Sequence, residues 1–403
     1  MATKFPFSIW NYNNIGEYTT AEVDTWAECG LTVTMSPALI YGEMDPKDLI
    51  PYLDAAEKNG IMLIAHVKGL EYNWVSELGL EKFEERFTEV YNAIKHPALY
   101  GFYVGDEPGS KQNFQDSWDS IAIQRRVAPE LKPYLNLHTG MDATDPELLG
   151  GRTFREWLKQ LASETGFCTF SYGTYDQVWD ERGVEQYYEN IRALVAAADG
   201  AGIDVWNTQL SSAHYMFRIP NYYETNWQIT TAAACGSRGI IWFRFYDRLA
   251  GPNYHGSPID EYGFKTPLYY DMLRAHRRFN DHFGELIMSL RHQETFMTVR
   301  PYGGYPVFGR NSHPVIKKVT GTEQAVIGFF KAEDGTEYMA VVNNSMDKPG
   351  VFNYEFDTEK YELRSVLFNG KQESKYNPET NCAHWDGEWF YPGQMIMYKI
   401  VEK

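Results

Sequence analysis

Two adjacent carboxylates, Asp106 and Glu107, carry the strongest chemical signal in this 403-residue sequence. They follow an apolar and aromatic run at residues 99–104 and precede Pro108. Like charges at the end of a buried strand cannot easily both ionise, so the pKa of one carboxyl is raised. The pair therefore predicts a site that needs an acid beside an anion. The alternative is that both residues cap the helix predicted after Pro108.

The sequence before residue 293 alternates short apolar strands with longer amphipathic stretches, which is typical of a parallel β/α fold. Eight strands are predicted, at residues 5–11, 31–36, 61–67, 99–105, 134–138, 167–172, 203–210 and 239–246. Eight helices follow them in turn, at residues 21–29, 46–59, 80–94, 112–127, 153–163, 184–198, 223–235 and 267–290. This succession predicts an α/β fold, a catalytic (β/α)8 TIM barrel over residues 1–292.

The pattern changes near Glu294, where helical periodicity ends. Short alternating runs then appear at residues 325–331, 338–343, 350–356, 361–367 and 395–400, separated by turn sequences. They predict a C-terminal antiparallel β-sandwich over residues 293–403.

Composition narrows the class of ligand. The formal charge of −17 argues against a nucleic-acid partner, and no apolar run approaches the ~20 residues of a membrane span, so no membrane insertion is expected. Aromatic residues make up 16% of the chain, and Tyr and Trp rings suit the apolar face and the hydroxyls of a sugar. No cofactor and no metal site are predicted, because His, Cys, Asp and Glu lack ligand spacing. The compartment (secreted, periplasmic or cytoplasmic) and the oligomeric state stay open.

The active site of a TIM barrel lies at the C-terminal ends of its strands, and the residues predicted there are aromatic or polar. Asp106 and Glu107 are the predicted catalytic pair at strand four. The residues predicted to bind substrate are Trp10, Asn11, His66, Tyr172, Tyr175, Asn207, Gln209, Trp242, Arg244 and Tyr246. Rings, amides and a few carboxylates in one cleft favour a neutral, polyhydroxylated ligand, so a glycan or glycoside is the expected partner.

Two stretches resemble a known enzyme superfamily. A barrel strand that ends in Asn-Glu-Pro resembles the acid/base motif of retaining TIM-barrel glycosidases, and this chain has Asp106-Glu107-Pro108 at that place. Residues 232–243 resemble the region between the seventh helix and the eighth strand of the same enzymes. The Asp-Glu-Pro triplet is similar to that of the N-acetyl-β-galactosaminidases of glycoside hydrolase family 123, and the Asp-Glu pair alone to family 20.

The chain departs from the superfamily pattern in two places. Asp106 stands where the superfamily has Asn, and the seventh strand has Asn207 and Gln209 but no nucleophilic Glu. Both departures fit substrate-assisted catalysis, in which the 2-acetamido oxygen of the sugar is the nucleophile. The resemblance implies a β-N-acetylhexosaminidase, with ionised Asp106 orienting the acetamido group and raising the pKa of Glu107, the general acid/base that begins protonated. Tyr172 or Tyr175 would hold the acetamido oxygen. The β-domain expected before the barrel in family 123 would follow it here.

Two other hypotheses remain. A two-carboxylate glycosidase on sugars without an acetamido group would keep Glu107 as acid/base and use Asp176 or Asp247 as the second carboxylate. A carbohydrate-binding barrel without catalysis would explain the missing seventh-strand Glu, although a costly Asp-Glu pair argues against it.

Overall fold

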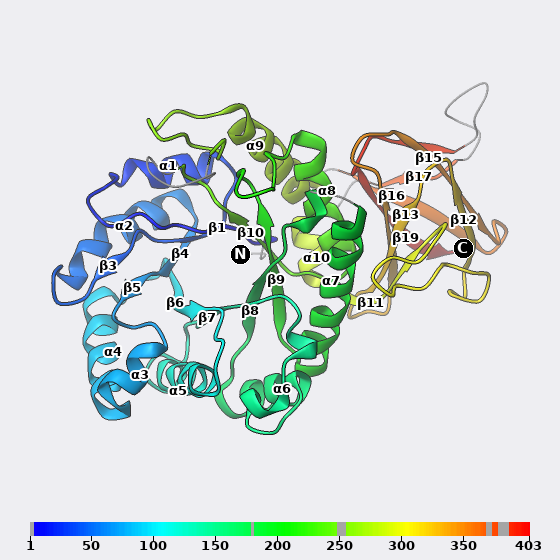
Figure 1. The fold of residues 1–403 in the computed structure, drawn as a ribbon. Helices are drawn as coiled ribbons and strands as arrows, with labels where there is room; N and C mark the ends of the chain where they lie inside the picture. The colour runs from blue at the N-terminus through cyan, green and yellow to red at the C-terminus, as the bar shows by residue number, and fades with distance from the viewer. Residues whose placement is uncertain (1–3, 179–180, 248–254, 368–372, 378–386) are drawn as a thin grey trace.

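In the computed structural model, the part of the chain described here comprises residues 4–178, 181–247, 255–367, 373–377 and 387–403. Eight parallel strands form one sheet that curls into a barrel with helices around its outside (Figure 1). In sheet order the strands are β1 (Phe7–Ile9), β10 (Ile240–Phe243), β9 (Asp204–Leu210), β8 (Thr169–Gly173), β7 (Tyr134–Leu137), β6 (Leu99–Asp106), β4 (Met62–Ala65) and β2 (Val33–Met35). The barrel is nearly closed, since Thr32 beside β2 donates its N–H to the Phe7 carbonyl of β1 at 2.9 Å.

A helix follows each barrel strand, as the sequence pattern predicts. The helices are α1 (Ala21–Glu28), α2 (Ile50–Asn59), α4 (Leu80–Ile94), α5 (Lys111–Val127), α6 (Phe154–Thr165), α7 (Glu181–Ala201), α8 (Tyr222–Ala234) and α9 (Pro267–Phe279). After α9 come a π-helical turn (Asn280–Gly284) and α10 (Glu285–Ser289). None of the described helices is long and apolar enough to cross a membrane.

The inside of the barrel is packed rather than hollow. Trp10, Tyr103, Tyr134 and Trp206 are buried and belong to one interior cluster, and the Tyr134 and Trp206 rings lie 6.2 Å apart. Side chains on the other faces of the same strands pack against the surrounding helices in a larger cluster. Parallel barrel strands are therefore buried on both faces, which explains their continuous apolar runs.

Between β2 and α4, extra elements build up one side of the barrel mouth. They are β3 (Leu39–Ile40), paired in parallel with β5 (Val67–Lys68), a short 3-10 turn (Pro46–Leu49), and α3 (Asn73–Leu78). These segments follow the second and third barrel strands and project beyond their C-terminal ends. They form a raised wall beside the site described below.

Antiparallel sheets follow the barrel. One has the order β11 (Arg291–Met297), β13 (Ala325–Lys331), β14 (Glu337–Asn343), β19 (Met395–Glu402), β16 (Tyr361–Val366) and β17 (Glu373–Lys375). The other has the order β12 (Ile316–Gly321), β15 (Gly350–Phe356) and β18 (Glu388–Phe390), and side chains of both sheets share one hydrophobic cluster. The antiparallel region is thus confirmed, whereas the sandwich and the boundary between residues 292 and 293, which falls inside β11, stay predictions.

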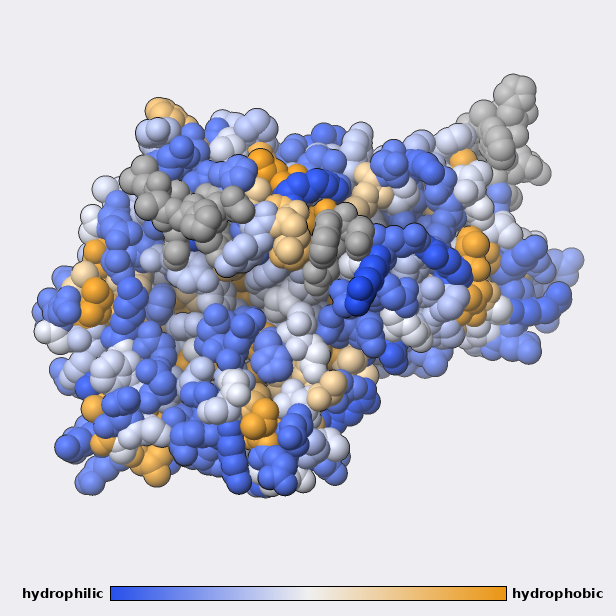
Figure 2. Space-filling model, in the orientation of Figure 1, coloured by the Kyte–Doolittle hydropathy of each residue, from blue (hydrophilic) through white to orange (hydrophobic). Residues whose placement is uncertain are grey.

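The larger antiparallel sheet lies directly against α8 (Figure 1). Gly328 on β13 approaches so closely that an added Cβ would lie 2.1 Å from the Ala234 carbonyl oxygen. Trp227 donates its indole N–H to Asn344 Oδ1 at 2.9 Å. These contacts hold the barrel and the sheet together. The face in Figure 2 is mostly hydrophilic, and its hydrophobic residues are scattered in small groups.

Candidate active site

The Asp106-Glu107 pair lies at the mouth of the barrel, where β6 ends at Asp106. Glu107 donates its backbone N–H to the Asn136 carbonyl at 2.9 Å and has a left-handed backbone, with φ of 43°. Such a conformation costs a non-glycine residue about 1 kcal/mol or more, and strained residues of this kind cluster at active sites. Helix α5 is capped by Ser110, whose hydroxyl accepts the Asn113 N–H. The pair therefore does not cap the helix, and that alternative is wrong.

Tyr72 contacts the backbone of residues 104–106 and holds it in place. Its ring covers Gly105, where an added Cβ would lie 2.3 Å from the ring, and its hydroxyl donates to the Asp106 carbonyl at 3.0 Å. The Tyr72 N–H also donates to the Val104 carbonyl at 2.7 Å. Position 105 therefore requires glycine, both for this close approach and for its φ of 149°.

A chain of hydrogen bonds inside the barrel holds the Asp106 carboxyl. Asn136 on β7 donates its Nδ2 to Asp106 Oδ1 at 2.8 Å. Its own Oδ1 accepts from Ser171 Oγ at 2.5 Å, and the Tyr134 hydroxyl lies 2.6 Å from Ser171 Oγ. Because Ser171 donates to the amide oxygen, the orientation of the Asn136 amide is set, and its nitrogen must face Asp106.

The pKa of Asp106 is raised from its ordinary value to about 6. Burial of the carboxyl is the main cause, the Asn136 hydrogen bond opposes it, and the neighbouring Glu107 charge adds to it. The sequence predicts the added proton affinity for Glu107. In the structure the pKa of Asp106 is raised, although the residue lies exposed at the end of β6, because neighbouring protein atoms at the mouth partly desolvate its carboxyl.

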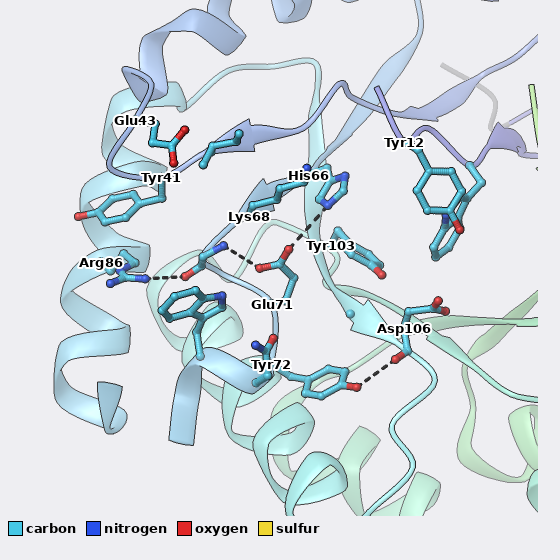
Figure 3. Close-up of a pocket in the computed structure, with 16 residues that line it drawn as sticks. Tyr12, Tyr41, Glu43, His66, Lys68, Glu71, Tyr72, Arg86, Tyr103 and Asp106 are labelled. Carbon is cyan, nitrogen blue, oxygen red and sulfur yellow. Dashed lines mark hydrogen bonds and ion pairs between the residues drawn. The ribbon is translucent and has the colours of Figure 1, made fainter. Parts of the chain in front are cut away.

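Asp106 lines a pocket of about 670 Å³ at the mouth (Figure 3). Glu107 is not among the residues that line this pocket. The floor and walls combine aromatic rings with charged and polar side chains. The lining residues are Trp10, Tyr12, Ile40, Tyr41, Glu43, His66, Lys68, Gly69, Glu71, Tyr72, Asn73, Trp74, Arg86, Tyr103, Gly105 and Asp106.

Glu71 is a second carboxylate in this pocket. Its Oε2 accepts the Gly69 N–H at 2.7 Å, and its Oε1 lies 3.8 Å from His66 Nε2. Burial raises the pKa of Glu71, but the bonds from His66 and from backbone N–H groups outweigh it, so the net pKa is lowered. In Figure 3 the Tyr103 ring lies between Glu71 and Asp106. The pocket thus holds Asp106, whose raised pKa favours the protonated carboxyl, and Glu71, whose lowered pKa favours the carboxylate.

Four of the residues predicted to bind substrate lie near the mouth. Trp10 and His66 line the pocket beside Asp106. Tyr175, which is half-buried, packs against Phe243 at 5.4 Å between ring centroids. The Arg244 guanidinium lies 5.0 Å from the centre of the Tyr12 ring. The ends of β1, β8 and β10 therefore contribute aromatic rings to the mouth.

The structure turns five other predicted residues away from the mouth, toward the helices. Gln209 bonds the Gln177 side chain at 3.1 Å, and Trp242 donates its indole N–H to His276 Nε2 at 2.7 Å. The same outward face carries Tyr172, Asn207 and Tyr246, which are also fully buried. Asn11 holds a loop, since its Oδ1 accepts the Asn13 N–H at 3.0 Å. Neighbouring residues in these strands face inward instead, among them Trp206 and Ile241.

The two aspartates predicted as second carboxylates are Asp176 and Asp247. The Asp247 carboxylate accepts the backbone N–H groups of Gly256 and Ser257 at 3.0 and 2.9 Å, so it fixes a loop. The side chain of Asp176 lies outside the described part of the structure. Among the described residues, no three His, Cys, Asp or Glu side chains are arranged to bind a metal ion.

Sequence reasoning missed Glu71, Tyr103 and Tyr12. Glu71 lies beyond the predicted end of strand three at residue 67, so no strand pattern pointed to it. Tyr103 lies within the apolar run before Asp106 and pairs with the inward-facing Tyr134 of β7, and an irregularity between Tyr103 and Gly105 then places Asp106 opposite Asn136. Because the strand is buried on both faces, no alternation in its sequence marks Tyr103 as an inward-facing residue.

No family model and no curated protein matches the chain. Solved structures do match. A glycoside hydrolase family 42 β-galactosidase from G. stearothermophilus aligns at 9% identity and a TM-score of 0.67, covering 99% of this chain and 98% of that one. A family 39 glycoside hydrolase from Bacteroides cellulosilyticus aligns at 11% identity and a TM-score of 0.54, covering 99% and 81%.

A β-galactosidase from a Rahnella species aligns at 10% identity and a TM-score of 0.56, covering 73% of this chain and 58% of that chain. This chain therefore spans little more than half of that enzyme. At such low sequence identity, these structural similarities show only that the chains share a fold. The fold is the TIM barrel that these glycoside hydrolases share, and the resemblance to families 123 and 20 rests on the sequence motif alone.

Proposed function

We propose that the protein is a glycoside hydrolase in which Asp106 and Glu107 carry the reaction. The observation behind the proposal is the position of the pair at the end of β6, with Asp106 lining a pocket of aromatic and polar side chains. Glu107 is the general acid that protonates the glycosidic oxygen and later the base that activates water. The likeness of the fold to glycosidases is consistent with this role.

The finer proposal is a retaining β-N-acetylhexosaminidase, acting on β-GalNAc or β-GlcNAc, in which the substrate supplies the nucleophile. Ionised Asp106 accepts the acetamido N–H and stabilises the positive charge of the oxazolinium intermediate. Asn136 donates to Asp106 Oδ1, and Asp106 Oδ2 is the oxygen that accepts the acetamido N–H of the substrate in this proposal. Support comes from β9, whose residues from Asp204 to Leu210 include no Glu that could serve as the nucleophile of the two-carboxylate reaction.

A second candidate is a two-carboxylate glycosidase on sugars without an acetamido group. One observation favours it: Glu71 is a carboxylate with a lowered pKa in the same pocket as Asp106, whose pKa is raised. Two carboxyls with pKa values pushed apart are the usual requirement for an acid and a base or nucleophile in one site.

A panel of aryl glycosides tests the proposal: β-GalNAc, β-GlcNAc, β-Gal, β-Glc and α-L-arabinofuranoside. We expect turnover of an N-acetyl-β-hexosaminide, and a loss of several orders of magnitude in kcat for Glu107→Gln, which removes the acid but keeps the shape. Glu359→Gln is the matched control, since Glu359 is exposed on the C-terminal region. Near-full activity of Glu107→Gln would remove Glu107 from the mechanism.

Two probes then separate the candidates. A thiazoline that mimics the cyclic intermediate should inhibit strongly if the acetamido group attacks. A 2-fluoro glycoside should leave the mass of the protein unchanged in that case. A glycosyl adduct on Glu71 or another carboxylate would establish the two-carboxylate reaction instead. Sugar binding without any turnover would favour a non-catalytic carbohydrate-binding barrel.

A further inference from the structure

The pocket at the barrel mouth has two ends. Figure 3 shows Tyr12 and Asp106 at one end and Tyr41, Glu43 and Arg86 at the other, with Glu71 and Tyr103 between them. The far end is built by the raised wall of β3, β5, α3 and the adjoining face of α4. Asp106 lies at the first end only, so the proposed reaction leaves the far end without a role.

The side chains at the far end are held in place before any ligand binds. The Arg86 guanidinium lies 4.5 Å from the centre of the Tyr41 ring and 5.1 Å from that of the Trp74 ring. Its Nη1 donates to the Gly69 carbonyl at 3.0 Å, and the Tyr41 hydroxyl donates to Glu89 Oε2 at 2.8 Å. Fixed rings lose little side-chain entropy when a ligand packs on them.

The size of the pocket also exceeds one sugar. A volume of about 670 Å³ lies in the middle of the ~300–1,000 Å³ range of pockets that take drug-sized ligands, and one sugar ring is smaller than such a ligand. A single ring bound at Asp106 would leave the far end unfilled. The lining there offers rings for CH faces, with Glu43, Lys68 and Asn73 as acceptors and donors for hydroxyls.

We propose that the end of the pocket formed by Tyr41, Trp74 and Arg86 is a second sugar-binding subsite, so that the ligand is an oligosaccharide of at least two units rather than a single sugar. The inference rests on the proposed function only in taking the ligand to be a glycan. Trp74 is half-buried and supplies the ring on which the second unit packs.

Binding is measured by isothermal titration in the Glu107→Gln background, so that turnover does not consume the ligand. The probes are GlcNAc, GalNAc, galactose, glucose and mannose, each with its β-linked homodisaccharide. We expect one disaccharide to bind about tenfold more tightly than its monosaccharide. Trp74→Ala should bring that ratio close to one and leave the monosaccharide Kd unchanged, because the second unit's packing on Trp74 supplies the tenfold, which equals about 1.4 kcal/mol. Trp74→Phe, which keeps a ring, should restore part of the ratio.

Trp118→Ala is the matched control. Trp118 is also half-buried and has an arginine, Arg152, 5.8 Å above its ring, but it lies on α5 in a separate cavity. Equal affinity for monosaccharides and disaccharides, an equal effect of Trp74→Ala and Trp118→Ala, or no binding of any probe would overturn the inference. Selective disaccharide binding with no hydrolysis by the unmodified protein would instead overturn the proposed function and leave the subsite intact.

Discussion

Asn136 Nδ2 lies 2.8 Å from Asp106 Oδ1, and this bond joins the candidate catalytic carboxyl to the buried polar chain of β7 and β8. The bond favours the ionised form of Asp106, in opposition to burial and to the charge of Glu107. Asn136 therefore sets both the orientation of Asp106 and the pH at which it loses its proton.

Replacing Asn136 should shift the pH dependence of the reaction. With substrate-assisted catalysis, activity needs ionised Asp106 and falls as the pH drops through about 6. Asn136→Ala removes a hydrogen bond worth about 1 kcal/mol to the ionised form, so the acid limb should move up by about one pH unit. A pH profile of kcat/KM measures the shift. Asn207→Ala, an amide on the outward face of β9, should leave the limb in place; an equal shift there would contradict the assignment.

Asp106→Asn should stabilise the protein at neutral pH while it lowers activity. A carboxyl whose pKa is raised in the folded state binds its proton more tightly there than in the unfolded chain. Stability of the unmodified protein therefore falls as the pH rises from about 4 toward 6, and the amide is free of this loss. We expect a higher Tm for the variant at pH 7 and a smaller difference at pH 5. A Tm difference that is unchanged between these pH values would contradict the raised pKa.

Gly105→Ala should damage the site through Tyr72. The new methyl group would lie 2.3 Å from the Tyr72 ring and would push it off the strand, breaking the hydroxyl bond to the Asp106 carbonyl. We expect a loss of about 2–3 kcal/mol in unfolding free energy and a fall in kcat, measured by denaturant unfolding and kinetics. Gly109→Ala is the control, since only the Glu107 carbonyl oxygen lies within 4 Å, at 3.9 Å. Equal effects of the two changes would argue against the clash.

Glu71→Gln should destabilise the protein in a pH-dependent manner. The lowered pKa of Glu71 means that its ionised form contributes stability at neutral pH, which is lost as the pH falls below its ordinary value of 4.5. Removing the charge should cost about 1–2 kcal/mol at pH 7, less at pH 4. Chemical unfolding at both pH values measures this. The exposed Glu77→Gln on α3 should have no such effect, and a pH-independent cost at Glu71 would point to shape rather than charge.

The sequence by itself determined the succession of eight strands and helices, the antiparallel region after them, and the place of the Asp106-Glu107 pair. Each depends on local information: apolar runs, helical periodicity, turn residues, and a charged pair directly after a buried strand. The pair needs only the end of its own strand to be located. That is why its position at the mouth could be predicted without any contact from elsewhere in the chain.

Only the tertiary structure decided which face of a strand each residue occupies. Parallel barrel strands are buried on both faces, so their sequences lack the alternation that would separate Trp206 from Asn207, or Ile241 from Trp242. Glu71 lies in the same pocket as Asp106 because the chain after the third barrel strand, from β5 to α3, forms one side of the barrel mouth. The pKa of Asp106 is raised because burial and the charge of Glu107 outweigh the opposing bond from Asn136, and the burial and this bond come from atoms of different strands. Long-range packing sets these environments, and no local pattern in the sequence encodes it.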